Sequence, residues 1–273
     1  MSDATQFCRV ERDGHLLVVT LDRPEVRNAL HRAASDELDR VWTQYETDHE
    51  LRVAILTGAG DRAFSAGYDM REPSTPAGER EGAVSTSGAA YIAHRHPRGL
   101  GALTLRYGMS KPIIAAVNGI ALGGGFELAL ACDIIVAAEH AEFGLPEPRV
   151  GRIALEGGMH RLARSISFKT AMGMLLTGRR ISAAEAYRAG LVNEVVPRAD
   201  LLLAARRWAD DILACAPLAV QATKEAVLKG LHLSLPDAVE LIPPTMAKAL
   251  VSSDQVEGVN AFLEKRAPRW SGR

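Results

Sequence analysis

Two glutamates in the middle of the chain have the surroundings that acid–base chemistry needs. Glu127 follows three consecutive glycines and has apolar residues on both sides, so a carboxyl group there faces loss of contact with water. Glu147 stands between two prolines that would make its loop rigid. Two close carboxyl groups can move protons between atoms, and they titrate as a coupled pair. A solvated surface carboxylate is the alternative interpretation of each.

Two turns of small residues, 63–69 and 121–127, are each predicted to follow a strand. Each could present a backbone N–H group closely to a ligand, because its side chains are small or missing. At the second turn, the helix expected next would aim its positive end at a developing anion. A glycine triplet taken alone is more often a turn or packing device. Its spacing also differs from the G-x-G-x-x-G pattern of dinucleotide-binding folds.

Other residues with reactive side chains give weaker signals. His94 and His96 have no acidic or cysteine partners beside them, so we expect no metal site. Ser65 lacks the G-x-S-x-G context of a hydrolase nucleophile and receives no catalytic role. The 3 cysteines are odd in number and far apart, which fits a reducing compartment better than a disulfide framework.

The elements that must position these residues alternate between strands and helices. Short apolar runs predict strands, and apolar residues at helical spacing predict the helices between them. This alternation is typical of an α/β fold. The expected strands are 15–21, 51–58, 112–117, 133–138 and 191–196, and the expected helices lie around 38–45, 126–131 and 182–190, the last opening with a capping box of Ser182 and Glu185.

Beyond residue 199 the pattern becomes helical throughout, with helices expected at 201–215, 218–231 and about 236–262. We therefore divide the chain into an α/β core, residues 1–199, and a C-terminal helical region, residues 200–273. The segment 72–101 is rich in Pro, Gly, Ser and Thr and sustains no period. Because it follows the first small-residue turn, we expect it to act as a lid over the site.

Composition excludes several classes of partner. The 273 residues include 32 basic and 33 acidic ones interspersed along the chain, so no basic surface is expected to attract nucleic acid or a membrane. Aromatic residues, at 5%, are too sparse for base-stacking platforms. The N-terminus lacks the layout of a secretory signal and no apolar run reaches membrane-spanning length. These features predict a cytoplasmic protein.

Several spaced motifs together resemble the crotonase, or enoyl-CoA hydratase, superfamily. They follow one another in register over nearly the whole chain, which makes the set far more specific than any single member. The motifs are Leu21-Asp22-Arg23-Pro24 with Asn28-Ala29-Leu30, Phe64 to Asp69, Asn118-Gly119 with Gly123 to Glu127, Cys132-Asp133, Phe143 to Glu147, and Ala261 to Arg266.

The resemblance implies a crotonase-like spiral of repeated ββα units and a C-terminal helical trimerisation region, commonly giving a dimer of trimers. It implies that the N–H groups of Ala66 and Gly124 form an oxyanion hole. It also implies that an acyl-CoA thioester binds to a set of residues that includes two from the C-terminal helices of a neighbouring subunit. That set is Arg27, Ala66, Gly67, Tyr68, Asp69, Met70, Gly124, Leu155, Phe262 and Lys265.

The implied reaction is the syn addition of water to a 2-enoyl-CoA thioester, giving a 3-hydroxyacyl-CoA. Negative charge develops on the thioester oxygen and must be met by donors that are already in place. Glu127 and Glu147 would activate the water together, with Glu147 donating a proton. No cofactor is expected beyond the coenzyme A of the substrate. Double-bond isomerases of the superfamily generally keep an acid at the Glu147 position alone, so the presence of both favours hydration.

One motif departs from the family. Many hydratases resemble Pro-Gly-x-Gly-Gly after the second glutamate, whereas this chain has Ala154-Leu155-Glu156-Gly157-Gly158. The N–H of Leu155 could still bind water, but Glu156 adds a third carboxylate. Isomerisation, dehydration of a specialised hydroxyacyl-CoA or carbon–carbon cleavage therefore stay open, as does a non-catalytic acyl-CoA-binding or RNA-binding trimer.

Overall fold

The computed structural model describes residues 5–71, 91–92 and 95–273, and its centre is a pair of β-sheets. The larger sheet has six strands in the order β1-β2-β3-β5-β7-β10, parallel except for the β1–β2 hairpin. Its strands are β1 (Cys8–Asp13), β2 (Leu16–Leu21), β3 (Val53–Gly58), β5 (Ile113–Val117), β7 (Ile134–Ala138) and β10 (Glu194–Val196). The smaller sheet contains β4 (Ala63–Ser65), β6 (Ile120–Leu122), β8 (Glu142–Gly144) and β9 (Arg180–Ser182).

Successive pairs of strands divide between the two sheets. β5 and β7 enter the larger sheet, and the strands after them, β6 and β8, enter the smaller one. Helix α3 (Gly124–Leu130) follows the first pair and α4 (Gly158–Ser165) the second. This repetition confirms the predicted ββα units. Because β6 and β8 pair with one another, this repetition also brings together the segments that follow them, which carry the two candidate glutamates.

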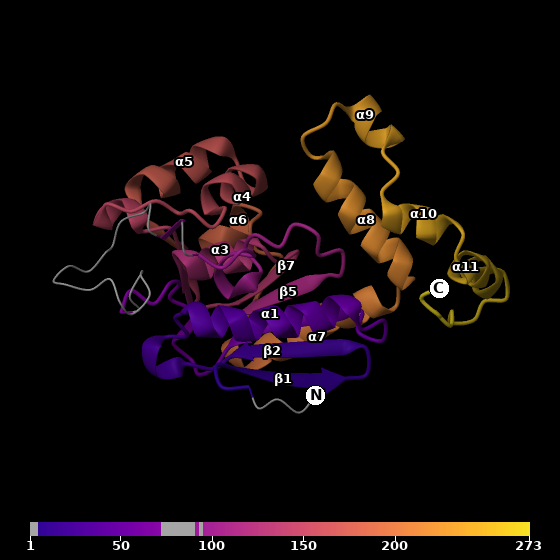
Figure 1. Ribbon diagram of the computed structural model, residues 1–273, viewed down its shortest axis with the longest axis horizontal. Coiled ribbons are helices and arrows are strands. Elements are labelled where there is room, and N and C mark those ends of the chain that lie inside the picture. The colour runs from indigo at the N-terminus through magenta and orange to yellow at the C-terminus, as the bar shows by residue number, and fades with distance from the viewer. Residues whose placement is uncertain (1–4, 72–90, 93–94) are drawn as a thin grey trace.

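Each face of the larger sheet is covered by a different helix (Figure 1). Alternate side chains of the central strands pack with α1 (Arg32–Thr47), whose Trp42 and Tyr45 are fully buried. The intervening side chains pack with α7 (Leu201–Leu213) through small residues such as Ala204 and Ala205. Burial on both faces explains why these strands are continuous apolar runs.

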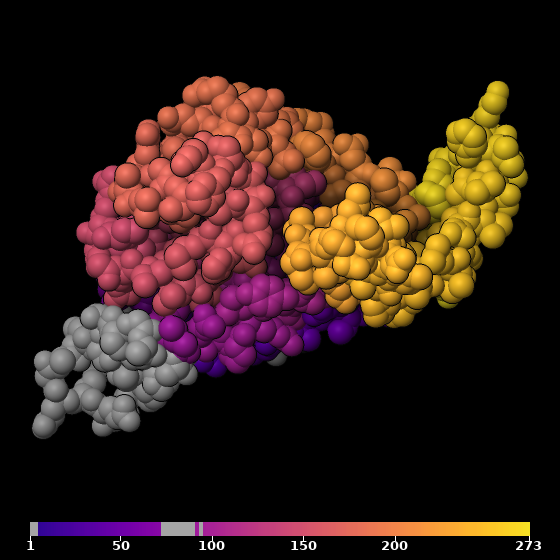
Figure 2. All heavy atoms as spheres, turned by 90° about the horizontal axis from the view of Figure 1, so that it is seen from above, coloured from indigo at the N-terminus to yellow at the C-terminus, as the bar shows by residue number. Residues whose placement is uncertain are grey.

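The C-terminal helices leave the body of the molecule after α7, and Figure 2 shows the last of them, in yellow, projecting from it. They are α8 (Pro217–Gly230), α9 (Leu235–Glu240), α10 (Pro244–Leu250) and α11 (Ser253–Leu263). The expected single helix over 236–262 is therefore wrong. Pro243 and Pro244 interrupt it, because a proline ring clashes with the preceding helical turn and provides no N–H.

The other predicted elements agree with the structure apart from their ends, whereas β1, the strands of the smaller sheet, α4 and the helix after it were not predicted from the sequence. The capping box of Ser182 and Glu185 opens α6 (Ala183–Arg188), and β10 is shorter than the predicted strand 191–196. Helix α5 (Phe168–Thr177) follows α4, and short 3₁₀ turns occur at Pro24–Val26, Leu100–Ala102, Glu147–Val150 and Arg198–Asp200. In the part of the chain that the structure describes, no helix is long and apolar enough to cross a membrane.

Candidate active site

Glu127 is held by the loop that precedes α4. It lies in the first turn of α3, and its side chain is almost wholly buried, with 2% of the residue exposed. One carboxylate oxygen, Oε1, accepts hydrogen bonds from the backbone N–H groups of Glu156 and Gly158, both at 2.8 Å. Gly158 has to be glycine, because a Cβ there would stand 2.7 Å from Cγ of Glu127.

The surroundings of Glu127 favour its protonated form. Burial is the largest effect, and the negative charges of Glu147 and Glu156 act in the same direction. The two backbone N–H groups oppose them, and the balance raises the pKa of Glu127 to about 8. A carboxyl group with such a pKa can gain or lose a proton near neutral pH, as an acid–base catalyst must.

Glu147 opens the 3₁₀ turn after β8 and faces the glycine turn after β6. Its Oε2 atom is buried and has no hydrogen-bond partner within the described residues. Burial raises the pKa of this carboxyl as well. A Cβ on Gly123 would lie only 2.9 Å from Oε1 of Glu147, and Gly123 has φ of 54°, so the turn needs glycine for two reasons.

The two small-residue turns meet at Gly67 and Gly124. A Cβ on Gly67 would be 2.8 Å from the backbone nitrogen of Gly124, and a Cβ on Gly124 would be 3.5 Å from that of Tyr68. The Gly124 N–H is at the first position of α3 and has no acceptor inside the helix. The backbones of both turns thus approach one another, as the family resemblance implies.

The predicted role of the Ala66 N–H is wrong. This group donates to the carbonyl oxygen of Arg27 at 2.9 Å and is therefore already engaged. On either side of Tyr68, the Gly67 carbonyl accepts the Leu30 N–H and the Asp69 N–H donates to the Leu30 carbonyl. Since neighbouring amides along an extended chain point to opposite sides, the N–H of Tyr68 points away from Leu30.

A cavity of about 620 Å³ joins these groups. The predicted residues that line it are Ala66, Tyr68, Met70, Gly124, Glu127, Glu147 and Leu155. Its remaining wall is mostly apolar, with Leu122 at the glycine turn and Val150 and Ile153 at the surface. A mainly apolar cavity with a few converging polar groups is the usual form of a small-molecule site.

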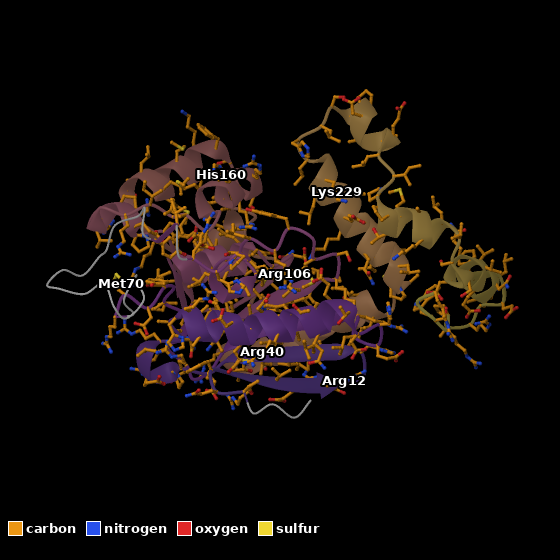
Figure 3. All side chains as sticks on the ribbon, viewed as in Figure 1. Arg12, Arg40, Met70, Arg106, His160 and Lys229 are labelled. Atoms are coloured by element: carbon orange, nitrogen blue, oxygen red, sulfur yellow. The ribbon has the colours of Figure 1, made fainter. Side chains whose placement is uncertain are left out.

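Five predicted binding residues do not line this cavity. Asp69 is buried in an ion pair with Arg23 at 3.1 Å, and the Gly67 carbonyl accepts the Leu30 N–H at 2.8 Å. The side chain of Arg27 is exposed. Phe262 lies in α11 and Lys265 in the turn that follows it. Figure 3 shows how far Met70, which lines the cavity, lies from the side of the molecule where Lys229 of α8 is found. Contact of Phe262 and Lys265 with the substrate of a neighbouring subunit stays a prediction.

The cavity also contains residues without a predicted binding role. Tyr91 and Leu100 come from the predicted lid, 72–101, of which residues 72–90 and 93–94 lie outside the described part of the chain. Arg149 and Arg152 bring positive charge to the cavity wall. No sequence signal marked the arginines, because a charged residue in a loop is most often only solvated. Ser65, as expected, is structural, since its hydroxyl donates to the carbonyl of Asn28.

The raised pKa of Glu127 predicts a stability change for Glu127→Gln. Between its ordinary pKa of 4.5 and about 8 the folded chain keeps a proton that the unfolded chain has lost, so the stability of the parent falls as pH rises through this window. The glutamine variant does not share this loss. Its melting temperature relative to the parent should therefore increase from pH 5 to pH 9.

A second buried carboxylate, whose pKa is lowered instead of raised, provides the control. Glu37 accepts backbone N–H groups of Gln6, Phe7 and Cys8, and these bonds lower its pKa. The parent gains stability from Glu37 at pH above its ordinary pKa, so Glu37→Gln should be less stable than the parent from pH 5 to pH 9. The same trend in both variants would contradict the protonated state of Glu127.

Comparison with known proteins agrees with this site. Residues 11–273 match the family model described as enoyl-CoA hydratase/isomerase. The chain is 41% identical to carnitinyl-CoA dehydratase of Escherichia coli strain K12, over 98% of this chain and 100% of that protein. An enoyl-CoA hydratase structure from Bacillus anthracis superposes with a TM-score of 0.86 at 37% identity, over 98% and 100% of the two chains. One from Mycobacterium marinum gives a TM-score of 0.85 at 37% identity, over 98% and 99%. The chain therefore belongs to the enoyl-CoA hydratase/isomerase family, the crotonase superfamily.

Proposed function

We propose that this enzyme adds water reversibly across the double bond of a 2-enoyl-CoA thioester. The observation that carries the proposal is the pair Glu127 and Glu147, which line one cavity and both have raised pKa values. One carboxyl group of the pair can stay protonated while the other is ionised, because two close carboxyls repel a second negative charge. Hydration needs one group in each state at the same time.

In the proposed reaction both carboxyls hold one water molecule. The ionised carboxyl takes a proton from the water while the water oxygen bonds to the β-carbon of the substrate. The electron pair of the double bond moves to the α-carbon, which receives the proton that the other carboxyl of the pair holds. Water oxygen and proton arrive from the same face, which gives syn addition. The reaction needs no metal or cofactor beyond the coenzyme A of the substrate.

The charge that develops on the thioester oxygen would be met by two backbone N–H groups. Gly124 provides one, and Tyr68 takes the role first assigned to Ala66. The support is the 3.5 Å approach of the Tyr68 nitrogen to the Cβ position of Gly124, together with the direction that the Leu30 pairing gives to the Tyr68 amide. Such donors act most strongly where water is excluded.

Dehydration of a 3-hydroxyacyl-CoA with a cationic acyl group is the second candidate. It is favoured by the 41% identity to carnitinyl-CoA dehydratase over nearly the full chain. The same residues run the reaction backwards, so only the acyl pocket separates the two. Tyr68 and Tyr91 pack edge to face in the cavity, with ring centroids 5.4 Å apart. Aromatic rings of this kind attract quaternary ammonium groups.

A substrate screen tests the proposal. The purified enzyme would be given short, long, branched, aromatic and trimethylammonium-bearing 2-enoyl-CoAs, and the loss of the conjugated-thioester absorbance would be followed. Hydration of an uncharged enoyl-CoA supports the first candidate, and selective turnover of the cationic substrate supports the second. If no substrate loses absorbance while a 3-enoyl-CoA gains it, the enzyme is an isomerase and the proposal is wrong.

We also propose that the enzyme assembles as a trimer or a hexamer in the cytoplasm. The helices beyond α7 expose large apolar side chains, among them Leu235, Val251 and Phe262 at 77%, 85% and 82%. Burying such a surface between subunits would be favourable. Sedimentation at micromolar concentration should give a trimer or a multiple of it, and a stable monomer would contradict the proposal.

A further inference from the structure

Glu156 is a buried carboxylate to which the proposed reaction assigns no step. Only 2% of the residue is exposed, although it lines the cavity. Its Oε1 atom accepts a hydrogen bond from the phenol hydroxyl of Tyr91 at 2.7 Å. Its Oε2 atom accepts the N–H of Leu100 at 2.8 Å and a hydroxyl hydrogen bond from Thr104. Burying a charge is costly unless such donors surround it, so this arrangement calls for an explanation.

These contacts fasten two parts of the active site together. The side chain of Glu156 binds the segment that includes Tyr91 and Leu100, both in the cavity wall. Its backbone N–H donates to Oε1 of Glu127. Arg161 makes a second connection between the same two parts, because it donates to the backbone carbonyls of Glu156 and Thr104 at 3.1 and 2.6 Å.

The backbone around Glu156 is shaped for this position. Gly99 has φ of 74°, and a Cβ there would overlap Oε2 of Glu156 at 2.3 Å. Gly157 has φ of 94°, which turns the chain so that the N–H groups on both sides of it reach the same oxygen of Glu127. Both glycines therefore have conformations that other residues rarely adopt.

We propose that Glu156 is a positioning residue, whose side chain fixes the 155–158 loop to the cavity wall so that two backbone N–H groups hold Glu127 in its reactive place. The expected effect on catalysis rests on the proposed function, whereas the placement of the loop rests on the hydrogen bonds described above. Hydrogen-bonded support of this kind matters because a displacement of about 1 Å can cost roughly 10²-fold in rate. Glu156 itself neither gives nor takes a proton from the substrate.

The charge of Glu156 also acts on Glu127. Four groups influence it electrostatically or lie beside it: Glu147 after β8, Glu156 in the loop, Arg161 on α4, and Tyr91, whose phenol binds Glu156. Among them the two carboxylates raise the pKa of Glu127. Removing the charge of Glu156 while keeping its shape should therefore lower the pKa of Glu127.

Two substitutions separate position from charge. Glu156→Ala removes the acceptors of Tyr91, Leu100 and Thr104, so the loop loses its attachment, and kcat should fall by about 10²-fold. Glu156→Gln can still accept the Leu100 N–H with its amide oxygen and donate to the Tyr91 oxygen with its amide nitrogen. It should recover most of the activity, and the limb of its pH–rate profile that reports Glu127 should move to lower pH.

Matched variants at Glu37 control for the loss of any buried carboxylate. Glu37 is 5% exposed, accepts several backbone N–H groups and lies outside the cavity. Glu37→Ala and Glu37→Gln should lose stability without moving the pH–rate profile. Activity would be expressed per folded protein, with the folded fraction measured by circular dichroism at the assay temperature.

A titration that needs no turnover makes the test independent of the reaction. Carbon-13 NMR of glutamate-labelled protein reports each carboxyl group, and Glu127→Gln identifies the signal of Glu127. In Glu156→Gln this signal should titrate at lower pH than in the parent, and in Glu37→Gln at the parent's pH.

The outcomes separate the two proposals. An enzyme that hydrates no enoyl-CoA but shows the shifted titration refutes the proposed reaction and supports the electrostatic link between the two glutamates. An unshifted Glu127 signal in Glu156→Gln overturns the inference. So does a Glu156→Ala variant no slower, per folded protein, than Glu37→Ala.

Discussion

Replacing Glu127 or Glu147 by glutamine should lower kcat for enoyl-CoA hydration by roughly 10²–10⁴-fold, the usual cost of losing a positioned acid or base. Glutamine is almost isosteric with glutamate and can still accept the N–H groups of Glu156 and Gly158. It cannot exchange a proton near neutral pH. The loss should therefore fall on the chemical step.

The affinity for coenzyme A separates this result from a damaged site. In the proposed complex the thioester is held by backbone groups and by the apolar wall, so the dissociation constant of a non-reactive acyl-CoA should stay close to that of the parent in both variants. Isothermal titration calorimetry measures this constant directly. Glu139→Gln, at an exposed position just after β7, is the control and should keep the parent's kcat.

The pH dependence of the variants adds a check on the assignment. In the parent the two carboxyls titrate as a pair, so kcat should have a bell-shaped profile. Either glutamine leaves a single carboxyl and should remove one limb of that bell. Parent-like hydration by both variants would show that the two glutamates are not the acid–base pair.

How accurately an element of the fold can be predicted from the sequence depends on where its apolar residues lie. Strands β2, β3 and β5 are buried on both faces, so each reads as a continuous apolar run and is located to within two residues. The prediction of one helix over 236–262 was wrong because apolar spacing alone does not reveal where a helix is interrupted. Apolar periodicity continues across Pro243 and Pro244, and only the backbone chemistry of proline shows the break.

The site shows a similar division between local and long-range information. Burial of Glu127 was predictable, because its neighbours in the sequence are apolar. The choice between the N–H groups of Ala66 and Tyr68 was not, since it depends on the pairing of this turn with Leu30. The partners of Glu156 are equally distant, as Leu100 is separated from it by 56 positions. Contacts of this kind form only when the chain has folded.

The second large effect concerns the backbone N–H of Gly124. Proline is tolerated at the first position of a helix, which is where Gly124 stands in α3, and it removes the N–H. Loss of one oxyanion donor costs about 10²–10³-fold in rate. Gly124→Pro should therefore lower kcat for hydration by a factor in this range.

Gly124→Ala is the matched variant that keeps the donor. A Cβ at this position would meet Cδ2 of Leu100 at 2.4 Å, and both substitutions introduce that contact. Because Cδ2 is the end of a flexible side chain, rotation of Leu100 can relieve the contact in either variant. The rate difference between alanine and proline then measures the N–H group itself. Infrared spectra of a bound thioester labelled with ¹³C at its carbonyl should show a lowered stretching frequency in Gly124→Ala and less lowering in Gly124→Pro. Equal rates and equal frequencies in the two variants would mean that the thioester oxygen does not bind Gly124, and the donor pair of Tyr68 and Gly124 would have to be abandoned.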